Sequence, residues 1–212
     1  VPLAAFAYVV FGLPYRVITF SLSLACLIVF FLEFLESFSG SFEKAASRIA
    51  SSIMIIIYPG YLVTYVTTMT IRDNAGALLS VFFMMVFFCD SLAWFFGMLF
   101  GKGNRGLIPA SPNKSLLGFF GGYFGSISAG VLAAFLFPEV YGGHVKQLVL
   151  IGFFTATAAI IGDIIESVLK RSTGIKDSGS LVPGRGGVLD SIDSVLLAAP
   201  VFYILTDFFF GS

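Results

Sequence analysis

Charge is scarce in this sequence of 212 residues, in which Asp, Glu, Lys and Arg together make up only 11%. Hydrophobic residues reach 58%, and counting the 23 glycines as well raises the apolar share to about 69%, against about 45–50% in ordinary soluble domains. A soluble core of this size does not need so much apolar surface. The composition therefore excludes an ordinary soluble domain and favours a polytopic membrane protein.

Cysteine and histidine are also scarce. Cys26 and Cys89 both lie inside apolar runs, and His144 is the single histidine, so neither a disulfide framework nor a zinc-ligand spacing is present. The 12 basic and 12 acidic residues cancel, which removes the electrostatic attraction for nucleic acid. No nucleic-acid partner is expected. Because no Met begins the chain, we expect the N-terminus to be incomplete.

Seven apolar runs divide the chain. Each is expected to be a helix, because an open sheet edge cannot exist in lipid, so the predicted fold class is all-α with about seven transmembrane helices. The first run is short enough to be a helical hairpin or an interfacial segment instead. The runs are Pro2–Tyr15, Val17–Leu35, Ile49–Thr70, Ala75–Phe100, Leu116–Phe137, Gln147–Leu169 and Val188–Phe210. We expect residues 1–74 to form N-terminal membrane helices and residues 75–212 to carry the chemistry.

Proline and glycine add detail to three of these runs. Pro59 and Pro200 are expected to kink their helices, since proline lacks a backbone donor. Glycine and serine recur four residues apart between Gly118 and Gly130, which favours close helix packing.

The basic residues are distributed unevenly between the two predicted membrane faces. Nine of the twelve lie in the loops 36–48, 101–114 and 170–187, and only Arg16, Arg72 and Lys146 lie on the opposite side. By the positive-inside rule, the nine-charge face is cytoplasmic, and a cell inner membrane is the expected location.

Acidic residues inside predicted spans indicate a polar site, because each costs about 2.5–3.5 kcal/mol to insert. Asp163 lies about 10 Å below the end of the sixth run at ~1.5 Å per residue. Asp190 and Asp193 are three residues apart at the start of the seventh run, so we expect all three carboxylates to converge at one depth. Asp90 lies deeper. Hard cations such as Mg²⁺ prefer such ligands, so the prediction is a cation site, and a second cation stays an open alternative.

Basic residues accompany these carboxylates. Lys170, Arg171, Lys176 and Arg185 stand among glycines in the loop 170–187. Acidic and basic side chains beside flexible backbone are typical of sites that hold phosphate and metal together. A loop that only fixes the membrane topology is the simpler alternative.

Two segments of the sequence resemble a known family. The segment Gly162–Ser194, with Gly162-Asp163, Lys170-Arg171, Lys176-Asp177 and Asp190-Ser-Ile-Asp193, resembles the signature of the phosphatidate cytidylyltransferases, also called CDP-diacylglycerol synthases. The segment Cys89–Gly122, with Cys89-Asp90, Gly101-Lys102 and Ser111-Pro-Asn-Lys114, resembles a second block of that family. The resemblance covers about residues 89–194.

The resemblance implies that CTP and phosphatidic acid react in the membrane lipid to give CDP-diacylglycerol and pyrophosphate, with Mg²⁺. It implies metal binding by Asp163, Asp190 and Asp193, and catalytic roles for Lys170, Arg171, Lys176, Asp177 and Asp90. The substrate-binding residues that it implies are Ser111, Lys114, Lys102, Arg185 and Ser167. The oligomeric state stays open, with a homodimer among the options.

The sequence also departs from the family pattern, and other classes remain open. Arginine is common in the family where Met98 and Ser191 stand, histidine where Ser180 and Arg185 stand, and an acidic residue where Leu117 stands. The main alternative is an ion-coupled transporter that uses the intramembrane aspartates. A CDP-alcohol phosphatidyltransferase is less compatible, because Asp190 and Asp193 lack its Asp-x3-Asp spacing.

Overall fold

The computed structural model describes residues 1–38, 40, 42–181 and 186–211. They form helices and connecting loops, with an isolated antiparallel bridge between Arg105 and Ser115, so the predicted all-α class is confirmed. The chain divides into two compact units, Val1–Asp73 and Asn74–Ser212.

The first unit contains a short helix and two longer helical segments. Helix α1 spans Pro2–Phe11 and ends at Gly12, whose φ of 63° suits glycine, and α2 spans Arg16–Ser37. The second long segment consists of α3 (Ala45–Ile55), the π-helix η1 (Ile56–Tyr61) and α4 (Thr64–Met69). Pro59 lies in η1, so the predicted irregularity takes the form of a π-helical turn, a common way to absorb a missing backbone donor.

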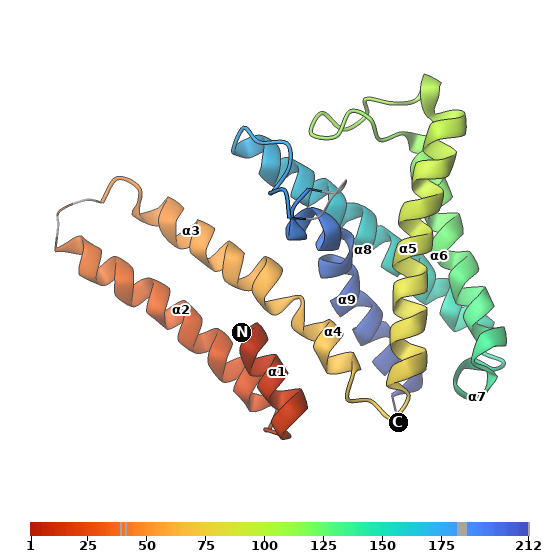
Figure 1. The fold of residues 1–212 in the computed structure, drawn as a ribbon, viewed down its shortest axis with the longest axis horizontal. Helices are drawn as coiled ribbons and strands as arrows, with labels where there is room; N and C mark the ends of the chain where they lie inside the picture. Colours follow the sequence, from red (N-terminus) through yellow and green to blue (C-terminus); the bar gives the residue numbers. More distant parts are fainter. Residues whose placement is uncertain (39, 41, 182–185, 212) are drawn as a thin grey trace. The chain divides into compact units, whose positions relative to one another are not determined.

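The second unit contains four long helices. They are α5 (Ala75–Phe100), α6 (Leu116–Leu136), α8 (Val145–Ser172) and α9 (Val188–Phe210), with the short elements η2 (Gly101–Gly103) and α7 (Pro138–Tyr141) between them. In this unit α6 packs along both α5 and α8, and α8 also packs along α9 (Figure 1). Helix α9 continues through Pro200 as one α-helix.

Six segments among the described residues are long and apolar enough to cross a membrane. They are Arg16–Ser37, Ala45–Met69, Ala75–Gly103, Leu116–Leu136, Val145–Ser172 and Val188–Phe210. Helix α1 has only 10 residues, whereas a span needs about 20, so it is too short to cross alone. Of the seven apolar runs, the first is therefore the one that does not form a helix long enough to span a membrane.

Small residues allow α6 to approach its neighbours closely. Gly121, Gly122, Gly125 and Gly130 are all buried on this helix. A Cβ atom added at Gly121 would lie 2.6 Å from the Leu92 carbonyl oxygen of α5, and one at Gly130 would lie 2.7 Å from the Leu148 carbonyl oxygen of α8. The predicted packing role of these glycines is confirmed.

Replacing Gly125 with alanine is expected to destabilise the second unit. Its added methyl group would overlap the Phe88 carbonyl oxygen, which belongs to the α5 backbone and cannot rotate away. Overpacking of this kind costs about 1–3 kcal/mol. Thermal unfolding of the purified protein in detergent measures the loss. Gly76→Ala is the control, because its methyl group meets no atom within 4 Å, and an equal loss in both variants would contradict the prediction.

Candidate active site

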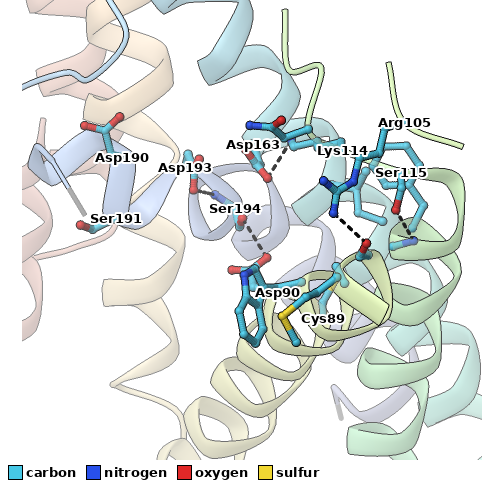
Figure 2. Close-up of a pocket in the computed structure, with 18 residues that line it drawn as sticks. Cys89, Asp90, Arg105, Lys114, Ser115, Asp163, Asp190, Ser191, Asp193 and Ser194 are labelled. Carbon is cyan, nitrogen blue, oxygen red and sulfur yellow. Dashed lines mark hydrogen bonds and ion pairs between the residues drawn. The ribbon is translucent and has the colours of Figure 1, made fainter. Parts of the chain in front are cut away.

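A pocket of about 600 Å³ lies in the second unit, within the range of about 300–1,000 Å³ common for small-molecule sites. Its walls come from α5, from the segment between η2 and α6, and from α6, α8 and α9. Arg105, Lys114, Asp163 and Asp193 are among the lining residues (Figure 2). The pocket therefore contains acidic and basic groups inside a largely apolar helix bundle.

Carboxylates from three helices lie near one another in this pocket: Asp90 from α5, Asp163 from α8 and Asp193 from α9. The Asp193 carboxylate lies within electrostatic range of both other carboxylates. Gly162 allows α8 and α9 to approach closely beside Asp163 and Asp193. A Cβ atom at Gly162 would lie only 2.5 Å from the Asp193 carbonyl oxygen, so a larger residue would push the two helices apart.

Hydrogen bonds fix the orientation of these groups. The Ser194 hydroxyl donates to Asp90 Oδ1 at 3.2 Å, and the Ser194 backbone N–H donates to Asp193 Oδ1 at 2.6 Å. Ser194 is 4% exposed. One buried serine thus links the carboxylates of α5 and α9.

Two cationic side chains lie in the same pocket. Lys114 Nζ is inaccessible to solvent and lies 2.7 Å from Asp163 Oδ2. The Arg105 guanidinium donates one hydrogen bond to the Gly97 carbonyl oxygen in the last turn of α5, at 3.1 Å. No carboxylate pairs with Arg105 among the described residues. Most of its five N–H donors therefore stay available to an anion.

Asp190 also lines the pocket, but its carboxylate is held elsewhere. Its Oδ1 atom lies 2.6 Å from Lys170 Nζ, and its Oδ2 atom accepts hydrogen bonds from Ser178 and Gly187. Residues three apart on a helix differ by about 60° in direction, which explains why Asp190 and Asp193 find different partners. No group of three Asp, Glu, His or Cys side chains in the described part of the chain is close enough to hold a metal, so the expected three-carboxylate cluster is not formed.

The other predicted site residues are more scattered. Lys102, Lys176 and Asp177 are exposed. Arg171 is exposed and donates to the carbonyl oxygens of Ala110 and Ile175, at 3.4 and 3.3 Å. Ser167 is buried on α8, and Ser111 is half-buried in a turn before Lys114. Arg185 lies outside the described residues. The Arg171–Ala110 contact joins the loops 101–114 and 170–187 at one end of the unit.

Sequence reasoning missed Arg105, Ser194 and Glu166. Arg105 was counted only as a topology signal, and Ser194 was recognised only as the end of a motif. Glu166 is 0% exposed, and its Oε2 atom lies 2.6 Å from Lys170 Nζ. The four-residue spacing of Glu166 and Lys170 on one helix was a signal that could have revealed this pair.

The fold and the pocket together define a polytopic helical membrane protein with a charged pocket among its helices. The model of the cytidylyltransferase family matches residues 1–209. The chain belongs to this family, and it is an integral membrane protein.

Curated relatives support the same family. The chain is 36% identical over 152 residues to a phosphatidate cytidylyltransferase of Helicobacter pylori, covering 71% of this chain and 54% of the relative. It is 39% identical over 159 residues to that of Thermotoga maritima, covering 74% and 58%. For that of Haemophilus influenzae, the identity is 42% over 132 residues, covering 59% and 44%.

These matches confirm the predicted family, and the relatives give no support to the transporter alternative. The matched regions span roughly half of each relative's own length.

Proposed function

We propose that this protein transfers the cytidylyl group of CTP to phosphatidic acid, giving CDP-diacylglycerol and pyrophosphate. The curated relatives carry the name of this activity, and the chain shares their family. The observation that carries the proposal is the pocket in which Asp90, Asp163 and Asp193 face Lys114 and Arg105. An acidic wall opposite basic side chains suits a nucleotide triphosphate bound with a divalent cation.

The reaction needs positioning more than proton transfer. An oxygen of the lipid phosphate attacks the α-phosphorus of CTP, and the bond from that phosphorus to the bridging oxygen of the β-phosphate breaks. The electron pair of that bond leaves with pyrophosphate. A phosphate monoester has a second pKa near 6 and is mainly dianionic at pH 7, so no strong general base is required. The residues of the pocket then have to hold the two substrates in line and balance their negative charge.

The donor set of the pocket fits Mg²⁺. Mg²⁺ sites commonly use one or two carboxylates together with water and substrate phosphates, so a cluster of three protein carboxylates is not required. Asp163 and Asp193 are the residues that would hold the ion, since α8 and α9 approach closely beside them. Asp90, which lines the same pocket and accepts a hydrogen bond from Ser194, is the carboxylate that would contact a second cation. When bound, Mg²⁺ supplies positive charge that neutralises the phosphates.

Lys114 and Arg105 are the pocket cations that we assign to phosphate. Lys114 already lies beside Asp163, so it can contact a phosphate placed at that carboxylate. Arg105 is oriented by the Gly97 carbonyl oxygen, and a guanidinium can hold phosphate oxygens in pairs. Both side chains therefore favour the negative charge that moves onto pyrophosphate as it leaves.

The test is product formation by the purified full-length protein. With Mg²⁺, CTP and phosphatidic acid in mixed micelles, we expect CDP-diacylglycerol and pyrophosphate in equal amounts. Pyrophosphate release without phosphatidic acid would point to simple CTP hydrolysis instead. If no CDP-diacylglycerol forms and reconstituted vesicles show cation-dependent solute uptake, the result would favour the transporter hypothesis instead.

We further propose that the pocket faces the cytoplasm across a cell inner membrane, where CTP is available. Nine of the twelve basic residues belong to the loops on the pocket side or to the loop 36–48. The homodimer stays a prediction.

Cysteine labelling is expected to reveal this orientation. Gly103→Cys and Ser180→Cys are exposed positions on the proposed cytoplasmic side and should react with a membrane-impermeant maleimide only after the cells are opened. Lys146→Cys, exposed at the start of α8, should react in intact spheroplasts. The protein with only its native Cys26 and Cys89 gives the background. The reverse pattern would contradict both the orientation and the access route for CTP.

A further inference from the structure

The end of α8 and the start of α9 are joined by a charged network. Lys170 Nζ lies 2.6 Å from Glu166 Oε2 and 2.6 Å from Asp190 Oδ1. The side chains of Lys170, Glu166 and Asp190 are 16%, 1% and 6% exposed. We call these three residues, together with Ser178 and Gly187, the Lys170 clasp. One ammonium group thus serves two almost fully covered carboxylates.

Both oxygen atoms of Asp190 are occupied within the clasp. While Oδ1 binds Lys170, Oδ2 accepts from the Ser178 backbone N–H at 2.8 Å, from the Ser178 hydroxyl at 2.6 Å and from the Gly187 backbone N–H at 2.6 Å. These donors come from three separate places in the sequence. Asp190 therefore holds together the end of α8, the segment after it and the first turn of α9.

Two glycines allow the chain to close around Asp190. Gly186 has a φ of 96°, and a Cβ atom there would lie 2.7 Å from Asp190 Oδ2. A Cβ atom at Gly187 would overlap the Ser178 hydroxyl. A side chain at either position would collide with the clasp, so the local backbone is adapted to surrounding this carboxylate.

Within the clasp, the Lys170 ammonium group has little hydrogen-bonding capacity left to bind a substrate. An ammonium group has three donors, and two short contacts with covered carboxylates hold this one. Lys114 and Arg105, in contrast, line the pocket. The first turn of α9, which Asp190 fixes, leads directly to Asp193 and Ser194.

We propose that Lys170 is a positioning residue: by balancing Glu166 and Asp190 it fixes the first turn of α9, and so places Asp193 and Ser194 in the pocket, without touching phosphate. This inference rests on the proposed function. It revises the catalytic role that the family resemblance implies for Lys170 and the metal-binding role that it implies for Asp190. Its specific consequence is that the positive charge of Lys170 is needed only because Glu166 and Asp190 are negative.

A pair of variants tests this consequence. Lys170→Met leaves two covered carboxylates without a cation. Adding Glu166→Gln restores the net charge of the clasp, since one positive and one negative charge are then removed together, and the glutamine amide can donate to Asp190. Lys146→Met is the matched control for losing a lysine charge, because Lys146 is an exposed lysine in the first turn of α8.

We expect Lys170→Met to lower kcat at least 100-fold and to lower the midpoint of thermal unfolding in detergent. The double variant should recover at least 10-fold in kcat and most of the unfolding midpoint, with a KM for CTP within about threefold of wild type. Lys146→Met should behave as wild type. If Lys170 bound phosphate directly, the additional Glu166→Gln substitution would not be expected to restore kcat.

The proposal is overturned if the double variant is folded but as inactive as Lys170→Met, because the lysine charge would then be needed in its own right. It is equally overturned if the double variant does not fold, or if the KM for CTP rises at least 10-fold in both variants. If wild-type protein forms no CDP-diacylglycerol, the proposed function fails, whereas the unfolding midpoints still test the clasp.

Discussion

Asp193→Asn is expected to lower the rate of CDP-diacylglycerol formation by about 10²–10³-fold, the effect typical of removing one electrostatic stabiliser. The substitution keeps the volume of the side chain and removes the charge proposed to hold Mg²⁺. The Asp193 carboxylate lies in electrostatic range of Asp163 and Asp90, and a bound cation would relieve the repulsion between Asp193 and these two carboxylates. Initial rates measured over a range of Mg²⁺ concentrations should therefore show a raised Mg²⁺ requirement as well as a lower maximum.

The matched control for this variant is Asp73→Asn, which removes an exposed carboxylate in the loop before α5. It should keep wild-type activity and the wild-type Mg²⁺ dependence. Near-normal turnover of Asp193→Asn at limiting Mg²⁺ would show that Asp193 is not a ligand. A fall in activity accompanied by an equal loss of folded protein would point to a structural role in the contact between α8 and α9.

Lys114→Met is expected to lower kcat by about 10²–10³-fold if the ammonium group stabilises the charge that develops on pyrophosphate. Methionine keeps much of the aliphatic stem, so packing against the pocket wall should change little. The reason for choosing this lysine is its location, since it lies in the pocket and its Nζ atom is 2.7 Å from Asp163 Oδ2. Steady-state kinetics with varied CTP give kcat and KM separately.

The two parameters distinguish two roles for Lys114. If the lysine only binds CTP in the ground state, KM rises while kcat changes little. Lys44→Met, at an exposed position before α3, controls for the loss of one basic residue on the same predicted membrane face. Unchanged kinetics in Lys114→Met would remove this residue from the site.

The membrane helices were predictable from the sequence because apolar runs of the required length leave few alternatives. The run Ala75–Phe100 coincides with α5, and the run Val188–Phe210 coincides with α9. Pro59 was recognised as a break, but its form, a π-helical turn, depends on how the backbone re-forms its hydrogen bonds. The short first run was already ambiguous, and its helix α1 is too short for a span.

The site was predictable in part. Asp90, Asp163, Asp190 and Asp193 were predicted as site residues because a charged side chain is costly to insert into lipid. All four line one pocket. Their individual partners were not predictable, because ion pairs such as Lys114 with Asp163 join residues 49 positions apart through tertiary packing. For the basic motif, the structure shows Lys170 paired with Glu166 and Asp190, and Lys176 and Arg171 exposed, so the roles of the two exposed residues stay predictions.

The residues that line the pocket all fall between Cys89 and Ser194, within the single unit Asn74–Ser212. An in-frame exchange of the gene segment that encodes the residues before Asn74 would leave the codons of all these pocket residues unchanged and in the same order.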